Sequence, residues 1–495
     1  MTPPDWHALS HSIESPNLLF VGGEWAEPRG GEHLSIASPI DGRHVTDVAL
    51  AGETDVDAAV SVARRAFEDG RWSRRSPRAR GAILVRWAEL CEAHRDRLAL
   101  LVSIEMGKPI SEARNVDVPA LVRTLRFYGE VADKLLDEAP HTDPGALALI
   151  RREPAGVVAA VVPWNFPLTI AAWKLAPALA VGCSVVLKLA EEAPLSMLAV
   201  AELASEAGLP PGVLSVLNGL GPVAGRALGV HGDVDVLAFT GSTEVGRLFQ
   251  SYSAESNLKR VYLELGGKSA NIVFPDADLD TAAATAAWSA FYNQGEMCSA
   301  GSRLLVHRDI HDELVARIVE KAVQMAPGDP LDLSSATGAM VSATHTAHVE
   351  GHVARALHAG ATLVAGGEKR DVVPGGSYYA PTVLDAVDPA AAIAHEEVFG
   401  PVLAVSCFTT EDEAVSLANG TRYGLAAGLW TRDLSRAHLV SGRLKAGVVW
   451  VNCFEEGDLT VPFGGVKLSG NGSDKSLHAL EKFVNWKTTW IQLAN

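Results

Sequence analysis

The chain has 495 residues, a length that corresponds to about three domains with cores of their own. Its 42 lysines and arginines stand against 59 aspartates and glutamates, a formal net charge of −17, and no run of basic residues interrupts that background. This balance argues against a nucleic-acid partner. Hydrophobic residues make up 48% and charged residues 20%, which is typical of folded globular proteins.

The cysteines and the N-terminal segment indicate a reducing compartment. Residues 1–15 lack both a basic start and an apolar stretch, so we predict no secretory signal and a cytoplasmic location. The cysteines are odd in number, widely spaced and free of zinc-site spacing, so we expect neither disulfides nor a bound metal. They are Cys91, Cys183, Cys298, Cys407 and Cys453.

Residues 154–173 are mostly apolar and carry no charge, as a membrane-spanning helix would. Pro163, Asn165 and Pro167 interrupt the stretch, and in lipid they would leave backbone groups without hydrogen-bond partners. The run that ends at Pro163 is better explained as a buried strand. We therefore expect no membrane partner.

From Gly156 onward, short apolar runs alternate with helical patterns. The runs cover residues 156–162, 184–188, 212–219 and 235–241, and helical patterns follow at 168–181, at 194–207, after Pro222 and from Thr243. Unbroken apolar strands separated by helices are typical of a parallel sheet that is covered on both faces. The pattern predicts a doubly wound α/β domain.

Ligands of such sheets bind beyond the carboxyl ends of the strands. Residues 163–167, 188–191 and 241–246 fall there. Gly241 and Ser242 suit a helix N-terminus that presents backbone N–H groups to a phosphate, so a dinucleotide is a plausible ligand. Ordinary turn and capping chemistry is the alternative, because the segment matches neither the G-x-G-x-x-G fingerprint nor a P-loop.

A second strand-rich region begins with residues 260–274, continues through a helix near 279–292 to residues 293–307, and is followed by further βα units toward Asn452. The segments 134–151 and 484–493 have alternating patterns without a place in either sheet. We expect them to form an added β-ribbon or a subunit interface.

Two residues of this region carry the candidate chemistry. Cys298 lies in a Gly- and Ser-rich loop, residues 294–301, between a helix and an apolar strand, which favours a reactive thiol. Glu264 ends an apolar strand beside two glycines, where a carboxylate can face a cleft, although an ordinary ion-pair role is equally compatible. No Ser/His/Asp order and no metal-ligand cluster competes with this pair.

Six motifs together resemble the NAD(P)-dependent aldehyde dehydrogenase superfamily in order and spacing, over almost the whole chain. They lie at 163–167, 241–246, 264–268, 298, 396–401 and 462–465. The resemblance implies an α/β aldehyde dehydrogenase fold with a Rossmann-like NAD-binding domain (1–133 and 152–262), an α/β catalytic domain (263–478) and a small β extension for oligomerisation (134–151 and 479–495). It also implies a homodimer or a homotetramer.

The resemblance assigns a mechanism by position. Cys298 would attack the aldehyde, while the Asn165 amide and the Cys298 backbone N–H hold the oxyanion. Water activated by Glu264 would then hydrolyse the thioester to a carboxylic acid, with Lys174 in its proton path. Two positions depart from the family pattern: Leu189 replaces a proline, and Asp474 replaces a glutamate that could relay protons.

The same comparison assigns the cofactor contacts. A carboxylate at Glu191 accepts hydrogen bonds from a free ribose 2′-hydroxyl and repels a 2′-phosphate, so NAD is favoured and NADP is the alternative. The implied cofactor-binding residues are Trp164, Lys188, Glu191, Gly221, Gly241, Ser242, Val245, Leu265, Glu397 and Phe399.

The C-terminal segments 431–452, 456–461 and 469–480 resemble the bacterial γ-glutamyl-γ-aminobutyraldehyde dehydrogenases of putrescine degradation. This favours an aminoaldehyde or its γ-glutamyl conjugate as substrate. Asp458, in an acidic loop, could attract an amine, and Gly457 would widen the tunnel. The other implied substrate residues are Phe166, Trp173 and Phe463.

Three alternatives stay open at this point. A broad-range aliphatic or aromatic aldehyde dehydrogenase would share these motifs. A CoA-acylating semialdehyde dehydrogenase would not need the carboxylate of Glu264. A catalytically retired protein of the same fold would not need Cys298, Glu264 and Asn165 together.

Overall fold

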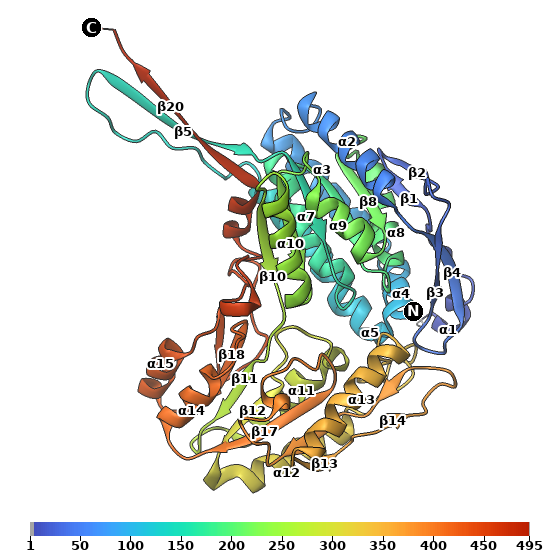
Figure 1. The fold of residues 1–495 in the computed structure, drawn as a ribbon, viewed down its shortest axis with the longest axis vertical. Coiled ribbons are helices and arrows are strands. Elements are labelled where there is room, and N and C mark those ends of the chain that lie inside the picture. Colours follow the sequence, from blue (N-terminus) through green and yellow to red (C-terminus); the bar gives the residue numbers. More distant parts are fainter. Residues whose placement is uncertain (1–3, 495) are drawn as a thin grey trace.

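The structure is a computed structural model that describes residues 4–494. Two seven-stranded sheets form two lobes, and a two-stranded ribbon projects from the body (Figure 1). This is the α/β architecture that the sequence predicts, with an added β extension.

The first lobe is built on the sheet β10-β9-β6-β7-β8-β1-β2. Its first five strands are parallel, and β1 and β2 add antiparallel strands at one edge. The bounds are β10 Arg260–Glu264, β9 Val236–Thr240, β6 Val157–Val161, β7 Ser184–Leu189, β8 Leu214–Asn218, β1 Leu19–Val21 and β2 Glu24–Ala26.

The strands β6, β7 and β8 are buried along their whole length, because helices cover both faces of this sheet. One face packs against α3 (Pro77–Ala93), α4 (Arg95–Met106), α6 (Val118–Val131), α7 (Pro167–Val181) and α8 (Leu195–Glu206). The other packs against α2 (Glu53–Glu68), α9 (Arg226–Val230) and α10 (Thr243–Glu255). Residues 154–173, the apolar stretch, form strand and helix of this lobe.

The second lobe is built on the sheet β13-β16-β17-β12-β11-β18-β19, in which only β13 runs antiparallel to its neighbour. The strands are β13 Thr362–Ala365, β16 Thr382–Asp385, β17 Val402–Phe408, β12 Arg303–His307, β11 Ala270–Val273, β18 Ala426–Trp430 and β19 Val448–Val451. Its helices are α11 (Leu279–Phe291), α12 (His311–Gln324), α13 (Ala343–His358), α14 (Glu411–Asn419) and α15 (Leu434–Arg443).

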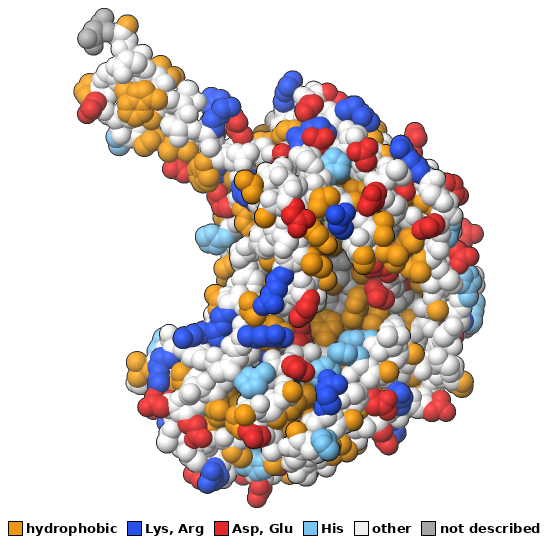
Figure 2. Space-filling view, in the orientation of Figure 1, with side chains coloured by type: hydrophobic (Ala, Val, Ile, Leu, Met, Phe, Trp, Pro, Cys, Tyr) orange, Lys and Arg blue, Asp and Glu red, His pale blue; other side chains and the backbone are white. Residues whose placement is uncertain are grey.

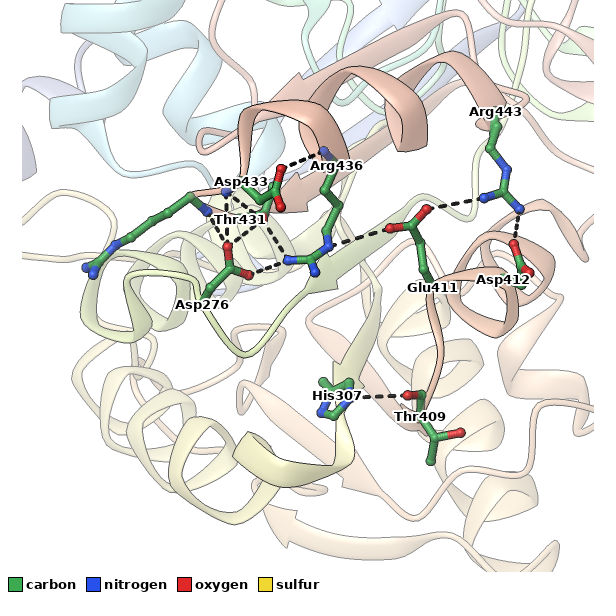
Figure 3. Close-up of polar contacts among 10 residues, drawn as sticks. Asp276, His307, Thr409, Glu411, Asp412, Thr431, Asp433, Arg436 and Arg443 are labelled. Carbon is green, nitrogen blue, oxygen red and sulfur yellow. Dashed lines mark hydrogen bonds and ion pairs between the residues drawn. The ribbon is translucent and has the colours of Figure 1, made fainter.

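Polar contacts fasten the outer helices of the second lobe to its strands (Figure 3). Arg436 on α15 lies 2.8 Å from Asp276, which follows β11, and 3.5 Å from Glu411 on α14. Thr431, directly after β18, donates its hydroxyl to Asp276 at 2.7 Å. These contacts fix the end of the lobe that lies away from the first sheet.

The ribbon pairs β5 (Ala146–Pro154) with β20 (Val484–Gln492) in nine antiparallel residue pairs. It leaves Trp486 and Trp490 50% and 60% exposed. The two segments that lacked a place in either predicted sheet thus pair with each other, from opposite ends of the sequence.

The remaining elements are short. They are α1 (Trp6–Ser10), α5 (Ile110–Glu112), the strand pairs β3 (His33–Ala37) with β4 (His44–Ala49) and β14 (Lys369–Arg370) with β15 (Tyr378–Tyr379), and single helical turns at Ala113–Asp117, Gly221–Gly225, Tyr292–Gly295, Arg308–Ile310, Ala392–Ala394, Lys467–Ser469 and Leu477–Phe483. Within residues 4–494, no helix combines the length and the apolar character needed to cross a membrane.

Candidate active site

Cys298 lies between two cavities that meet where the lobes face each other. One, of about 280 Å³, is lined by the carboxyl ends of β6 and β9 together with residues of the second lobe. The other, of about 330 Å³, runs between α6, α7 and α11. Cys298 and Ile170 line both. A molecule in either cavity therefore reaches the same thiol.

The loop that carries Cys298 is held in one conformation by buried hydrogen bonds. Asn293 and Gln294 adopt left-handed backbone angles, with φ of 52° and 57°, which non-glycine residues rarely adopt. The Gly338 N–H donates to Gln294 Oε1 at 2.9 Å, and the Val341 N–H donates to the buried Glu296 at 3.0 Å. Strained backbone and buried polar anchors of this kind are typical of preorganised sites.

Asn165 is anchored to the same loop. It follows β6 directly, is 2% exposed, and donates from Nδ2 to the Glu296 carbonyl at 2.9 Å. Asn293 donates in turn to the Asn165 carbonyl at 3.3 Å. Because a side-chain amide has two N–H groups, Asn165 keeps a second donor for an oxygen bound in the cavity that it lines with Cys298.

The thiol is neutral at rest. Burial raises the pKa of Cys298 well above its usual range, and the nearby carboxylates of Glu455, Glu397 and Glu264 raise it further. A base must therefore accept the thiol proton before the sulfur becomes a nucleophile.

Glu264 is the last residue of β10, and its carboxyl group is buried. Burial raises its pKa well above the usual carboxyl range, and the charge of Asp474 adds to the shift. Among the described residues neither carboxyl oxygen has a hydrogen-bond partner. A Cβ on Gly464 or Gly472 would lie 3.0 or 3.1 Å from Oε1, so these glycines make room for the side chain. A carboxyl group in this setting is suited to proton transfer near neutral pH.

A buried charge cluster adjoins Glu264. Lys174 on α7 donates to Asp474 at 2.6 Å, and Lys482 donates to its other oxygen at 2.5 Å. All three side chains are at most 5% exposed. Burial opposes ionisation of Asp474, but the two ammonium groups outweigh it and hold the pKa below its usual range. Asp474, the departure from the family pattern, is thus the shared partner of both lysines.

A larger cleft of about 880 Å³ adjoins the smaller cavity and shares Trp164, Glu397 and Phe399 with it. Figure 2 shows a hollow between the lobes, bordered by hydrophobic and histidine side chains. At the cleft, Glu191 accepts from Lys188 Nζ at 3.1 Å and from the Gly221 N–H at 2.7 Å. The glutamate is thereby oriented with a carboxylate edge along the cleft.

The N-terminus of α10 faces the smaller cavity. Ser242 caps the helix by accepting from the Val245 N–H at 3.3 Å, and Gly241 and Ser242 line the cavity with Leu265. The buried hydroxyl of Thr240, another lining residue, has no partner among the described residues. Val245 lies outside the lining. Free N–H groups and an unpaired hydroxyl fit the phosphates of a dinucleotide.

The opposite wall comes from the second lobe. Glu397 accepts from the Gly267 N–H at 3.0 Å, and burial raises its pKa to about 7. Phe399, with φ of 55°, packs edge to face on Trp164 at 5.4 Å between ring centroids. His345 Nε2 lies 2.7 Å from the Phe399 carbonyl oxygen, so that nitrogen carries the proton. The wall is aromatic with one carboxyl group, which fits a flat ring attached to a ribose.

Aromatic side chains line the second cavity, which we call the tunnel. The predicted substrate residues Phe166, Trp173 and Phe463 are among them, and Trp288 and Tyr292 complete the wall. Its polar lining residues are Glu112, Thr169, Ser299, Glu455 and Lys475. Gly457 and Asp458 are exposed and lie outside the lining.

A family model described as "Aldehyde dehydrogenase family" matches residues 25–489. The chain belongs to the aldehyde dehydrogenase family. Among curated members it is 47% identical to the NADP/NAD-dependent aldehyde dehydrogenase PuuC of Escherichia coli (99% of this chain, 98% of the relative) and 45% identical to aminoacetaldehyde dehydrogenase of Pseudomonas aeruginosa (98% of each).

Solved structures of the family have the same fold. The γ-glutamyl-γ-aminobutyraldehyde dehydrogenase of Burkholderia cenocepacia is 52% identical, with a TM-score of 0.97 over 99% of each chain. The indole-3-acetaldehyde dehydrogenase of P. syringae, solved with NAD+, is 49% identical, with a TM-score of 0.98 over 99% of each chain. The predicted family and fold class are confirmed.

Several residues of this aldehyde dehydrogenase site were not predicted. His345, Lys475 and Lys482 were assigned no role, although Lys475 lies within the segment 469–480, and Glu455 was expected only as part of the acidic loop that could attract an amine. Lys482 carried one signal: it stands eight residues after Asp474 in the same C-terminal segment. Only the folded chain shows that His345, Glu455 and Lys475 line the two cavities and that Lys482 joins the buried cluster at Asp474.

Proposed function

We propose that this enzyme oxidises an aldehyde to a carboxylic acid with NAD, using Cys298 as the nucleophile. The observation that carries the proposal is the position of Cys298, which lines both the cofactor-sized cleft system and the aromatic tunnel. A thiol in that position can hold the substrate carbon from one side while the cofactor ring approaches from the other.

NAD fits the residues present. Glu191 and Lys188 would hold the adenosine ribose beside Gly221, the α10 N-terminus at Gly241 and Ser242 would hold the phosphates, and Glu397 would hold the second ribose. Trp164, Leu265 and Phe399 would enclose the nicotinamide, and Val245, whose N–H is taken by the Ser242 cap, would support the α10 N-terminus from outside the lining. When bound, NAD supplies the hydride acceptor of the reaction.

In the first half of the reaction, Cys298 Sγ forms a bond to the aldehyde carbon and its proton passes to a carboxylate, for which Glu264 is the candidate. The carbonyl oxygen becomes an oxyanion, which accepts from the second N–H of Asn165 Nδ2 and from the Cys298 backbone N–H. The fixed Asn165 amide needs no reorganisation for this, since Glu296 and Asn293 already hold it.

Loss of the aldehyde hydrogen as hydride, to the acceptor that NAD would supply, converts this adduct into a thioester of Cys298. In the second half, water attacks that thioester. Glu264 accepts the proton of that water, the C–S bond breaks, and the acid leaves with the thiol restored. Lys174 and Asp474, which are hydrogen-bonded to each other and close enough to Glu264 to affect its pKa, would take part in moving the Glu264 proton toward solvent. The raised pKa of Glu264 supports this assignment, because a base that titrates nearer neutrality transfers protons in both directions.

The substrate we propose is an aminoaldehyde such as γ-aminobutyraldehyde, or its γ-glutamyl conjugate. The relatives of P. aeruginosa and B. cenocepacia support it through their names. Asp458, on the exposed loop beside the tunnel, would attract the ammonium group, and Gly457 would leave its path open. A broad-range aldehyde dehydrogenase is the second candidate, favoured by the aromatic lining of the tunnel and by a relative named for indole-3-acetaldehyde.

NAD rather than NADP follows from Glu191. Its carboxylate lies where a ribose 2′-hydroxyl would donate and a 2′-phosphate would be repelled. Lys188 offsets part of this charge, in keeping with a relative that uses both cofactors.

We assign residues 1–133 and 152–262 to NAD binding, 263–478 to catalysis, and 134–151 with 479–495 to the oligomerisation of a homodimer or homotetramer. The exposed tryptophans of the ribbon support the last assignment. The five cysteines are all unpaired, which supports a cytoplasmic location.

The test is NADH formation by the wild type and by Cys298→Ala, with propanal, γ-aminobutyraldehyde and its γ-glutamyl conjugate, each with NAD or NADP. We expect turnover with NAD that the variant loses, and higher kcat/KM for the nitrogen-bearing aldehydes. Turnover that requires CoA would show that the thioester is cleaved by thiolysis and not by hydrolysis. Protein that binds NAD without any turnover would contradict the proposal.

A further inference from the structure

The tunnel contains a lysine that the proposed reaction does not use. Lys475 lines the tunnel next to the aromatic pair Trp173 and Phe463. Its Nζ lies 5.8 Å from the Trp173 ring centroid and 5.7 Å from that of Phe463. A Cβ on the exposed Gly457 would be 3.8 Å from the same nitrogen. The ammonium group thus lies beside the exposed loop, at the mouth of the tunnel.

The backbone directs this side chain into the mouth. Lys475 and Ser476 both adopt left-handed angles, with φ of 63° and 51°. Asp474, just before them, exchanges two backbone hydrogen bonds with Phe463, and the Ser476 N–H donates to the Leu459 carbonyl at 2.7 Å. Two consecutive strained residues fixed on both sides are a costly arrangement, and such strain is concentrated at functional sites.

The ammonium group of Lys475 makes no hydrogen bond and no ion pair within 4 Å to any residue among 4–494. Three carboxyl groups face it from farther away. Asp474 is already paired with two other lysines, and Asp458 accepts from the Thr460 N–H at 2.7 Å. Glu455 is half-buried, and the burial of its carboxyl group raises its pKa to about 7, so it is only partly charged at neutral pH.

The mouth therefore presents a positive group with unused hydrogen-bond donors on an apolar aromatic wall. An incoming ammonium group would meet like charge there, whereas a carboxylate would gain a charge-assisted hydrogen bond. Trp173 and Phe463 would exclude water from that contact, which strengthens it.

We propose that Lys475 forms a carboxylate subsite at the tunnel mouth, so that the enzyme selects aldehydes whose far end carries a carboxylate. This inference rests on the proposed function and sharpens it. Of the two substrates proposed above, the γ-glutamyl conjugate has such a carboxylate and γ-aminobutyraldehyde does not. Asp458, on the neighbouring loop, is then available for the α-ammonium group of the same glutamyl group.

The test compares kcat/KM for the γ-glutamyl conjugate of γ-aminobutyraldehyde with that for its α-carboxyl methyl ester, which has the same chain without the carboxylate charge. We expect the wild type to prefer the acid by about tenfold to 100-fold, as for a hydrogen bond to a charged group. Lys475→Met keeps the apolar contacts and should abolish the preference by slowing the acid alone, while Lys475→Arg should keep most of it. Lys369→Met, which removes an exposed ammonium outside both cavities, is the matched control.

Equal kcat/KM for acid and ester in the wild type would overturn the subsite, whatever the variants do. If Lys475→Met lowers kcat/KM equally for both substrates, in protein with an unchanged melting temperature, then Lys475 shapes the tunnel and does not bind a carboxylate. Failure of the proposed function is distinguishable, because then the wild type would not oxidise the methyl ester or propanal at all.

Discussion

The acid–base groups of the site share one physical condition: burial keeps them protonated toward neutral pH. It raises the pKa of the Cys298 thiol and of Glu264, and brings those of Glu397 and Glu455 to about 7. The reaction needs the deprotonated forms of Cys298 and Glu264. Activity should therefore increase with pH through and above neutrality.

A pH profile with Glu264→Gln tests this condition. Because the Glu264 pKa is raised well above the usual carboxyl range, its carboxylate form gains population as pH rises, so wild-type kcat should rise with pH through neutrality. Glu264→Gln should lower steady-state kcat by about 10²-fold to 10⁴-fold, as loss of a general base does. A burst of NADH near one per active site should remain, because thioester formation then outpaces hydrolysis. A flat wild-type profile would contradict the assignment.

Asp474 is the residue whose loss should most affect stability around the site. Asp474→Asn would leave the Lys174 and Lys482 ammonium groups buried without a counter-charge, at a cost of about 3–5 kcal/mol. Since the folded-state pKa of Asp474 is lowered, its contribution is present above the usual carboxyl pKa and is lost as pH falls through the folded value. Urea unfolding at neutral and acid pH measures both.

The double variant Asp474→Asn with Lys482→Met is the control for that experiment. It removes one of the two uncompensated charges, so it should be more stable than Asp474→Asn alone. If Asp474→Asn unfolds at the same urea concentration as the wild type, then Asp474, Lys174 and Lys482 are not all charged in the folded protein.

At the scale of single elements, one cap links stability to cofactor binding. Ser242→Ala removes the hydroxyl that accepts from the Val245 N–H and should cost about 1 kcal/mol of stability. Because the same N-terminus faces the smaller cavity, NAD should also bind more weakly, as measured by fluorescence titration.

Thr410→Ala provides the comparison for this cap. Thr410 caps α14 by accepting from the Glu413 N–H at 3.2 Å, and it lines neither cavity nor the larger cleft. Its loss should cost similar stability with no change in NAD affinity. Equal NAD dissociation constants for both variants would show that the α10 N-terminus does not contribute to NAD binding.

The elements that could be predicted from sequence are those whose residues are buried on all sides. β6, β7, β8 and β9 are continuous apolar runs, and α7 and α10 begin within one residue of their predicted starts. The edge strands β1 and β2 were not predicted, because three-residue strands with partly exposed side chains lack a periodic signal.

The residues of the candidate site also fall into those that sequence patterns mark and those that they do not. Asn165, Glu264 and Cys298 stand at strand ends or in loops that sequence patterns mark. Asn165 and Cys298 line the same cavity, and Glu264 is close enough to Cys298 for its charge to raise the thiol pKa. Lys475 and His345 could not be found, because their positions depend on which segments the fold brings against the cavities. The acidic loop with Glu455 and Asp458 was expected at the tunnel opening on charge alone. Glu455 lines the tunnel together with Glu112, whereas Asp458 lies outside the lining.

At the scale of the whole molecule, the ribbon is the feature without an intramolecular partner face. It projects from the body, and its outer residues Trp486 and Trp490 are half-exposed or more (Figure 1). Trp490→Asp should weaken self-association by placing a charge in an apolar interface, and light scattering should show a smaller mass. The melting transition of the body should change little.

Leu439→Asp is the matched substitution for that test. Leu439 lies on α15 and is 64% exposed, so it also replaces an exposed apolar side chain by a charge. We expect its mass to equal that of the wild type. The same mass for all three proteins would exclude the ribbon tip from the interface.

The two cavities on either side of Cys298 also define how an inhibitor of this enzyme should be built. An inhibitor that extends past the Cys298 sulfur would occupy both cavities, of about 280 and 330 Å³, so one molecule could carry a ring for each cavity. Joining the two fragments makes the second binding event intramolecular and raises its effective concentration. Affinity would come from the half that faces Trp164 and Phe399, and discrimination between related enzymes from the half that reaches Lys475.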